Sequence, residues 1–384
     1  MATGLVSKSN RTALGEIGQS YNRSYIASLD YLRALAAFTI VIYHGLITFR
    51  GYTNNGPWNL ERWPAFWNPL AAYFVEGHTA VALFMVLSGY VLTMGVIGRD
   101  LLYWRFMKNR ALRIYPLYIF LLMFGISLHP EAFNIQSFFQ AILPLANNPG
   151  SFQTEVITAL FWTVSVEFQF YFIFPFLIRF IEKEGKIYIT LVIVMMLVFS
   201  GISTFYSIDT NQFAYHTIFG RLSQFLLGMG AAYIPSRTWM SAKFALPLGA
   251  VAMLSLLLAY HRMGGYPVHT WWKLVWPVVE AIGWSCIILT SINSPHRMPL
   301  RFGRIIKIIA NMSFSMYLIH SIVFQIFGER KLYLTPFKSV YENAFLNSFL
   351  LVPIVAVLSY MTYRLIEFPF MELRVRYVST GPQS

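Results

Sequence analysis

The chain has 384 residues, of which 57% are hydrophobic and only 12% charged, and its mean hydropathy is +0.54. A water-soluble domain carries about a quarter charged residues, so this composition excludes an ordinary soluble enzyme and indicates a protein embedded in a bilayer. The net charge of +13 does not indicate nucleic-acid binding, because the basic residues lie in short loops between apolar segments.

Few features bear on compartment and domain organisation. Cys286 is the only cysteine, which excludes an intramolecular disulfide and a cysteine-based metal site. Residues 1–29 lack the apolar core of a cleaved signal peptide and are expected to be a cytoplasmic tail, as are residues 371–384. No repeat or linker divides the rest, so residues 30–370 are predicted to form one membrane domain.

Apolar segments follow one another along the whole of this domain. A span needs about 20 mainly apolar residues, and by that rule we expect an all-α protein with about ten transmembrane helices. The third helix could begin early, because residues 101–113 form a basic amphipathic lead-in. The predicted spans are 30–49, 70–95, 114–129, 160–180, 187–205, 214–234, 243–260, 273–293, 305–327 and 346–367.

The basic residues test this count through the positive-inside rule. With the N-terminus in the cytoplasm, 20 of the 29 Lys and Arg fall in cytoplasmic segments and 7 in external ones. The excess runs in the same direction along the whole chain, whereas a missed span would invert every later loop. An even number of spans with both ends cytoplasmic is therefore predicted.

The first predicted span carries two ionisable side chains. Arg33 and His44 are eleven residues apart, so they share one helical face, separated by roughly 16 Å along the axis. Arg33 lies near the cytoplasmic end, where it could equally snorkel to lipid headgroups. His44 lies nearer the external end, as either a structural hydrogen-bonding partner or a functional group.

The second predicted span begins at the external side. Glu76 and His78 are expected at the outer boundary, where they fit a solvated rim. Ser88 and Gly89 lie deeper, and small residues there more often allow close helix packing than carry chemistry. Ser88 remains a pocket candidate.

The fourth predicted span places Glu167 and Tyr171 four residues apart and therefore on one face. A carboxylate at that depth must be paired or protonated. The nearest candidate in depth is His44, and a Glu–His pair would orient the imidazole and raise its basicity, as a general base requires. The alternative is an inert buried ion pair.

Other polar residues complete the set of candidates. His320 lies toward the outside of the ninth predicted span, and Arg221 lies mid-span without an obvious partner. Arg110 and Arg113 are three residues apart on the cytoplasmic side, adjacent on one face if helical. Paired guanidinium groups suit phosphates, although they could simply orient the protein in the membrane.

The depths of these residues suggest one arrangement. The arginines gather at the cytoplasmic side, whereas His44 and Glu167 lie toward the outside. A phosphorylated donor could dock inside and extend an arm to a base near the external surface. A channel or simple carrier has less need of that combination.

Six segments, in order, give the chain a resemblance to a known family. It resembles the acyltransferase-3 family of integral membrane O-acyltransferases over nearly its whole length. Each segment alone is a weak signal, but six in register are strong. They are LDYLRALAAFTIVIYH, FMVLSGYVL, RFMKNRALRIYPLY, FWTVSVEFQFYFIFP, MSFSMYLIHSIV and RLIEFPF.

The resemblance implies roles for particular residues. It implies an Arg-x10-His motif at Arg33 and His44, with the histidine essential for transfer, and an Arg-x-x-Arg pair at Arg110 and Arg113 that binds the acyl donor. Members of the family typically move acetyl groups from acetyl-CoA onto glycan hydroxyls. Many carry an appended SGNH hydrolase-like domain, and the short loops here lead us to expect the form without one. The Trp-x-x-Ser-x-Glu segment of the family falls on Trp162, Ser165 and Glu167.

The resulting hypothesis is acyl transfer, most simply O-acetyl transfer, from cytoplasmic acyl-CoA to a sugar hydroxyl of an exopolysaccharide or another cell-envelope glycan. Arg33, Arg110 and Arg113 would hold the donor. His44 would act as general base or become transiently acylated, with Glu167 orienting it. No metal is expected. We expect a multi-pass protein of the inner (plasma) membrane, with polysaccharide-synthesis or export proteins as potential partners.

Two alternatives stay open at this point. One keeps the fold and changes the acyl group or the acceptor, for example a small-molecule glycoside. The other is a transporter of acyl groups or glycans in which His44 and Glu167 relay protons. A transporter would be expected to show inverted repeats with interrupted spans, and none is evident in the sequence.

Overall fold

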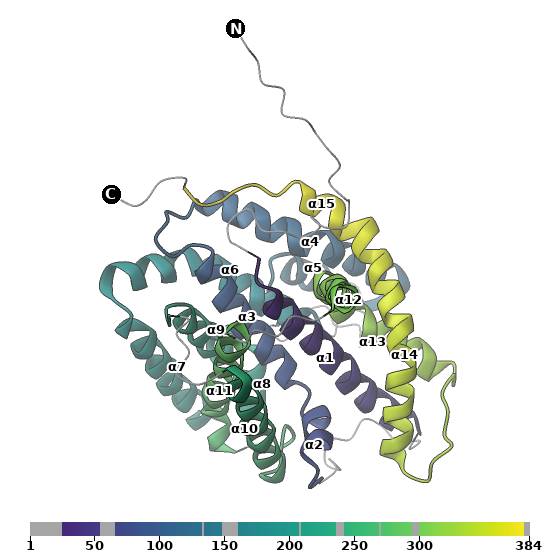
Figure 1. Ribbon diagram of the computed structural model, residues 1–384. Coiled ribbons are helices and arrows are strands. Elements are labelled where there is room, and N and C mark those ends of the chain that lie inside the picture. The colour runs from purple at the N-terminus through teal and green to yellow at the C-terminus, as the bar shows by residue number, and fades with distance from the viewer. Residues whose placement is uncertain are drawn as a thin grey trace.

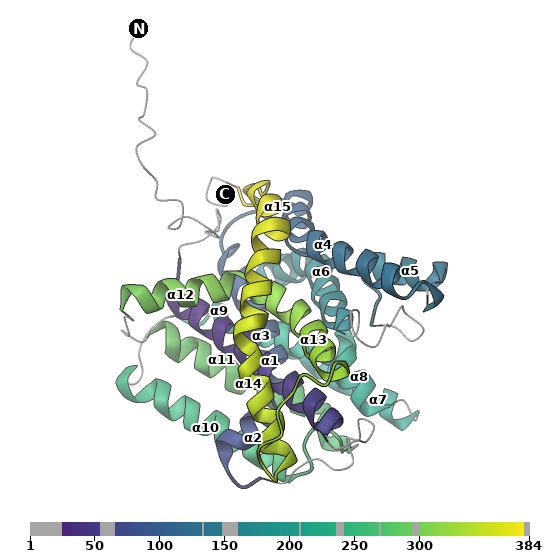
Figure 2. The same ribbon diagram turned by 90° about the vertical axis from the view of Figure 1, so that its right-hand side faces the viewer.

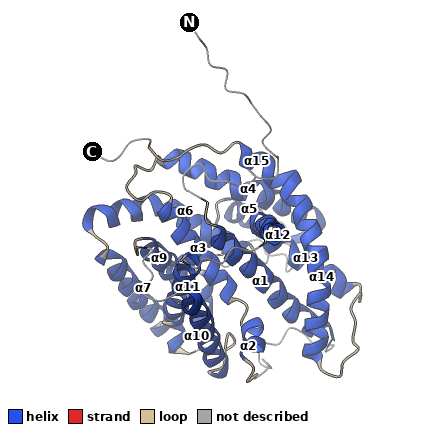
Figure 3. Cartoon of the chain, viewed as in Figure 1, coloured by secondary structure: helices blue, strands red, loops and turns tan. Residues whose placement is uncertain are grey.

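The structure is a computed structural model that describes residues 25–53, 66–132, 134–147, 160–206, 209–235, 242–268, 270–293 and 299–379. These ranges are almost entirely helical, and their one β-type pairing is an isolated bridge between Leu101 and Val378 (Figure 3). The α-helices are α1 (Ala27–Thr53), α2 (Pro69–Val75), α3 (Thr79–Met94), α4 (Tyr103–Leu128), α5 (Ile135–Ile142), α6 (Phe161–Glu184), α7 (Ile187–Phe205), α8 (Thr210–His216), α9 (Ile218–Ala232), α10 (Ala242–Arg262), α11 (Trp276–Ile292), α12 (Leu300–Asn311), α13 (Ser313–Glu329), α14 (Val340–Thr362) and α15 (Phe368–Glu372).

Six of these helices are long and apolar enough to cross a membrane: α1, α4, α6, α7, α10 and α14 with its continuation to Glu372. Two bent pairs, α2–α3 and α12–α13, raise the number to eight if each pair is one span. The predicted all-α, polytopic fold is therefore confirmed. The count of ten spans and the cytoplasmic position of both ends stay predictions, because α9 and α11 are shorter than a full span, with 15 and 17 residues.

Two spans predicted as continuous are broken. The segment 70–95 bends by 76° between α2 and α3, and the segment 305–327 bends by 69° between α12 and α13. Hydropathy missed the first break because Glu76–His78 is only three residues long within an apolar run. It missed the second because α12 is amphipathic: its basic residues give it the character of an interfacial helix, and the apolar α13 follows at an angle.

The third predicted span, 114–129, corresponds to α4, which begins earlier than predicted. α4 starts at Tyr103, so the basic lead-in and the apolar segment form one helix of 26 residues. The C-terminal segment lies along its start, where the Asn109 side chain exchanges two hydrogen bonds with the backbone of Val375 (2.6 and 2.9 Å). Figures 1 and 2 show α4 and α15 together at one end of the molecule and α2 at the opposite end, with α14 running between the two ends.

The centre of the bundle depends on a close helix crossing. A Cβ atom at Gly89 of α3 would collide with the carbonyl oxygen of Phe225 on α9, and one at Gly228 of α9 would collide with that of Val86 on α3. The two glycines thus let the backbones approach from both sides, as small residues do in membrane proteins. The predicted packing role of Gly89 is confirmed. Around this crossing, α1 packs against α13 and α14.

Candidate active site

A pair of histidines joins α1 to α13. Nδ1 of His44 lies 2.8 Å from Nε2 of His320, and the two ring centroids are 4.8 Å apart. His320 is fully buried, whereas His44 is partly accessible. His320 was a sequence candidate, but its pairing with His44 could not be predicted, because the sequence does not indicate which spans are neighbours.

The partners of His320 assign the tautomers of the pair. Nδ1 of His320 lies 2.8 Å from the carbonyl oxygen of Met316, one helical turn earlier, and a carbonyl can only accept, so this nitrogen carries the proton. In a neutral pair, Nε2 of His320 is then an acceptor and Nδ1 of His44 must donate to it. The lone pair of His44 is therefore on Nε2, the ring nitrogen that is not bonded to His320.

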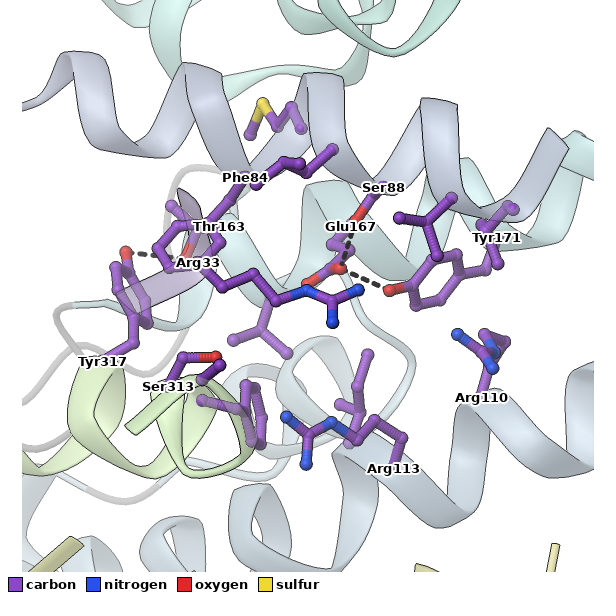
Figure 4. Close-up of a pocket in the computed structure, with 18 of the residues that line it drawn as sticks. Arg33, Phe84, Ser88, Arg110, Arg113, Thr163, Glu167, Tyr171, Ser313 and Tyr317 are labelled. Atoms are coloured by element: carbon purple, nitrogen blue, oxygen red, sulfur yellow. Dashed lines mark hydrogen bonds between the residues drawn. The ribbon is translucent and has the colours of Figure 1, made fainter. Parts of the chain in front are cut away.

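A cavity of about 240 Å³ lies among α1, α3, α4, α6 and α13 (Figure 4). It brings together six of the candidates from the sequence, although these come from four different helices. The charged residues that line it are four arginines and one glutamate, so the cavity is positively charged. Those candidates are Arg33, Ser88, Arg110, Arg113, Glu167 and Tyr171, and Arg374 is the fourth arginine.

Two of the guanidinium groups in this cavity, those of Arg33 and Arg110, make few hydrogen bonds within the described residues. Arg110 lies over the rings of Phe106 and Tyr171, with distances of 5.5 and 5.4 Å to the centroids, and its buried Nε has no hydrogen-bond partner among the described residues. Arg33 donates to Asp30 across 3.2 Å. A buried guanidinium nitrogen without a partner is costly, and an anionic ligand with several acceptor oxygens would supply one.

The break before α13 adds to this anion site. Ser313 and Phe314, in the first turn of α13, line the same cavity as the arginines. The first backbone N–H groups of a helix have no partner within the helix, and the macrodipole gives that end a partial positive charge. In membrane proteins, the N-terminal end of a helix that begins at such a break often points at the binding site of an anionic group.

The structure contradicts the expected pairing of Glu167 with His44. Glu167 accepts a hydrogen bond of 3.0 Å from Ser88 and a short one from Tyr171, both on Oε1 (Figure 4). It therefore belongs to the arginine cavity, whereas His44 is bonded to His320. Similar depth in the membrane misled the prediction, since depth does not specify which helical faces meet.

Tyr317 connects the cavity to the histidine pair. It lines the cavity, shares a hydrogen bond of 2.7 Å with Thr163, and its ring centroid lies 6.0 Å from that of His320. Neither Tyr317 nor Thr163 was predicted as a site residue, because a tyrosine and a threonine in apolar helices resemble ordinary packing residues. Tyr317 lies in a motif already noted, three residues before His320, and that spacing was the available signal.

Three further candidates lie outside this cavity. The ring of Trp162 lies against that of His216, with centroids 4.3 Å apart and the planes inclined by 31°, and Ser165 accepts a hydrogen bond of 3.0 Å from the backbone N–H of Ala146. Arg221 is buried and donates to the carbonyl oxygen of Tyr215 and the side chain of Gln224, at 3.0 and 3.2 Å. These contacts indicate structural roles.

The prediction that Glu76 and His78 form a solvated rim is wrong. The two side chains are 0% and 6% exposed, because the break between α2 and α3 turns them into the protein. Glu76 lies 2.7 Å from Nδ1 of His261 and accepts from the backbone of Tyr266. The bond to Glu76 comes from the backbone N–H of Tyr266, and Lys273 donates to the carbonyl oxygen of the same residue and to the Asn211 side chain. Burial lowers the pKa of Lys273 to about 8.

Metal-binding groups and a second cavity remain to be placed relative to the site. Within the described ranges, no group of three or more His, Cys, Asp or Glu side chains is arranged to hold a metal ion. A second cavity, of about 720 Å³, lies between α1, α2 and α14 and is lined mainly by apolar side chains. None of the sequence candidates lines that cavity, so the arginine cavity and the histidine pair define the candidate site.

Comparison with known proteins agrees with this geometry. The family model described as an acyltransferase domain (Acyl_transf_3) matches residues 26–364. The O-acetyltransferase OatA of Staphylococcus aureus is 29% identical over 240 residues, which cover 56% of this chain and 35% of that protein. The peptidoglycan O-acetyltransferase OatA of Listeria monocytogenes is 25% identical over 202 residues, 45% of this chain and 28% of that protein.

The matched region thus spans about a third of the length of these relatives. No solved structure matches the chain. The family model, in contrast, covers most of it, including Arg33, His44, Arg113 and His320. The chain is a multi-pass membrane protein that belongs to the acyltransferase-3 family.

Proposed function

We propose that the protein transfers an acetyl group from acetyl-CoA to a hydroxyl group of a cell-envelope glycan. One observation carries the proposal: α1 and α13 each contribute to both a cavity rich in arginines and a histidine pair. The cavity suits the phosphates of a CoA thioester, and the pair supplies a base. The similarity to O-acetyltransferases supports acetyl as the group, and the relative named as a peptidoglycan O-acetyltransferase supports a glycan such as peptidoglycan as the acceptor.

Arg33, Arg110 and Arg113 are the proposed ligands for the donor phosphates. Each presents N–H donors to a cavity that has one carboxylate against four guanidinium groups. Guanidinium groups bind phosphate oxygens in pairs, and the first turn of α13 adds backbone donors. We place this cavity at the cytoplasmic face of the inner membrane, following the distribution of basic residues along the chain.

His44 is the proposed catalytic base. The acceptor oxygen attacks the thioester carbonyl, the new C–O ester bond forms, the C–S bond breaks, and CoA leaves as its thiolate. Nε2 of His44 takes the hydroxyl proton and returns it to the thiolate, so no proton is gained or lost. Nε2 is equally the atom that would form an acyl-histidine intermediate. Acid quench of a single turnover, followed by mass spectrometry of the α1 peptide, distinguishes the two routes.

The test uses purified protein in nanodiscs with radiolabelled acetyl-CoA, and compares wild type with His44→Ala. We expect the wild type to hydrolyse or transfer the label and the variant to lose about 100-fold or more of that activity, the contribution of a general base. Equal activity in a folded variant would remove His44 from the mechanism. If the wild type neither used nor bound acetyl-CoA, the assignment of the donor would be wrong.

A further inference from the structure

A buried carboxylate near the end of the chain has no part in the reaction just proposed. Glu367 belongs to the RLIEFPF segment, and its side chain is 0% exposed. Oε2 accepts a hydrogen bond of 2.6 Å from Nη1 of Arg113, and Oε1 accepts a short one from Ser315. Both carboxylate oxygens are thus bonded, one to the donor cavity and one to α13.

A local irregularity brings this side chain inward. The helix that begins as α14 turns into a π-helical turn over Tyr363–Glu367 and continues as α15. A π-turn adds a residue to the helical turn and so rotates the side chains that follow, and such turns are frequently found at functional sites. Here the turn directs Glu367 into the protein, while Leu365, two residues earlier, is 72% exposed.

The ion pair determines which donors of Arg113 remain for a ligand. Nη1 contacts Glu367 and the sulfur of Met371, at 2.6 and 3.1 Å, and Nη2 donates to the carbonyl oxygen of Asn311 across 3.3 Å. Among the described residues, Nε and the second hydrogen of Nη2 have no such partner. Nε and Nη2 form one edge of the planar guanidinium, and the N–H groups of such an edge match two oxygens of a phosphate.

The second oxygen of Glu367 ties this arrangement to α13. Ser315 lies two residues after Ser313 and two before Tyr317, both of which line the donor cavity, and five before His320. A single carboxylate therefore fixes both the orientation of Arg113 and the first turn of the helix that carries the partner of His44.

We propose that Glu367 is a positioning residue for donor binding: it holds the Arg113 guanidinium so that the edge formed by Nε and Nη2 faces the phosphates of the acyl donor. The inference rests on the function proposed above. It goes beyond that function because Glu367 touches neither the cavity space nor the reacting atoms. Its negative charge, considered alone, would weaken anion binding, so its contribution must come from geometry.

An effect of charge and an effect of positioning predict opposite changes in the KM for acetyl-CoA. Glu367→Gln removes a negative charge near the donor cavity. If Glu367 acted only through its charge, the KM for acetyl-CoA would fall in the variant. Positioning predicts the opposite: the KM rises about tenfold, the size expected when a charged hydrogen bond is lost, while kcat stays within about threefold. Glu372→Gln, an exposed glutamate five residues away, is the matched control and should match the wild type.

A double-mutant cycle tests whether Glu367 affects the KM through Arg113. If Glu367 acts through Arg113, Glu367→Gln should raise the KM in the wild-type background and leave it unchanged once Arg113→Ala is present. Independent, additive effects would overturn the inference. Ser315→Ala keeps the charge and frees one carboxylate oxygen, so a smaller rise in KM is expected. It also serves as the test if Glu367→Gln does not fold.

The outcomes separate this inference from the proposed function. A wild type that does not use acetyl-CoA overturns the function and the inference with it. A wild type that uses acetyl-CoA, together with a folded Glu367→Gln variant whose KM is unchanged or lower, overturns the positioning role alone. A thermal unfolding midpoint measured by tryptophan fluorescence for each variant establishes that the protein is folded.

Discussion

His320 faces His44 with its Nε2 at 2.8 Å from Nδ1, and it is held in that orientation by the carbonyl oxygen of Met316. This chain of two hydrogen bonds places the lone pair of His44 on Nε2. In many enzymes a carboxylate orients the catalytic histidine, whereas the group that would orient the proposed base here is a second histidine, which carries no charge in the neutral pair. The pair therefore adds no charge to a buried site, where an unpaired charge would be costly.

His320 can be tested by substitutions that keep or remove its Nε2. We expect His320→Ala to lower kcat about 100-fold, because His44 loses the acceptor that fixes its tautomer. In His320→Gln the side-chain oxygen can take the position of Nε2, so kcat should recover to within about tenfold of wild type. His129→Ala, an exposed histidine at the end of α4, is the control. Equal losses in the Ala and Gln variants would argue against orientation through Nε2.

Arg110→Ala should raise the KM for acetyl-CoA about tenfold and change kcat little, since the loss falls on binding of the phosphates. Raising the ionic strength should also raise the KM of the wild type, because salt screens charge attraction in a cavity open to solvent. The comparison is steady-state kinetics at two salt concentrations. Arg262→Ala, which removes a guanidinium lying over Trp67, should leave the KM unaltered. A KM independent of both salt and Arg110 would show that the cavity does not bind the donor.

Glu167→Gln discriminates between the two positions considered for this carboxylate. The glutamine oxygen can still accept from Ser88 and Tyr171, so the fold should be retained. A carboxylate bonded to His44 would favour the charged imidazolium, and removing it would shift the pH profile of kcat to lower pH. Because Glu167 lies in the arginine cavity instead, we expect the profile to stay in place. A clear shift to lower pH would restore the pairing expected from the sequence.

The crossing of α3 and α9 should tolerate no side chain. Gly228→Val would force apart backbones whose glycines leave no room for a Cβ, so we expect loss of folded protein on size-exclusion chromatography in detergent. Gly201→Val, on α7, is the matched control because nothing lies within 4 Å of its would-be Cβ atom. Similar yields of the two variants would contradict the crossing.

Lys273 should make the stability of the folded protein depend on pH above neutrality. Its pKa is lowered by burial to about 8 from an ordinary value of 10.5, so between these values the unfolded chain binds more protons than the folded one. Stability should therefore rise as the pH increases from about 8 to about 10.5. Tryptophan-fluorescence melts across this range should show the rise in wild type and a smaller one in Lys273→Met. Parallel curves would show that Lys273 does not titrate there.

The sequence predicted the helical membrane fold and the clustering of polar residues on particular faces. The spacing of Arg110 and Arg113, and that of Glu167 and Tyr171, correctly placed each pair on one side of a helix, because helical periodicity is a local property. It could not predict that His44 meets His320, since contacts between helices depend on tertiary packing. The two broken spans escaped for a related reason: hydropathy averages over many residues and does not detect a break of one to three.

The uninterrupted course of α1 has a consequence for donor selection. Arg33 and His44 belong to one helix of 27 residues without a proline, so their separation of roughly 16 Å along the axis is set by the helical rise. Such a helix fixes the distance that the donor must span between its phosphates and its thioester. The activity of a donor should therefore depend on its length. Acetyl phosphate is too short to reach from Arg33 to His44, and an acetylated pantetheine without phosphates lacks the group that would bind at Arg33.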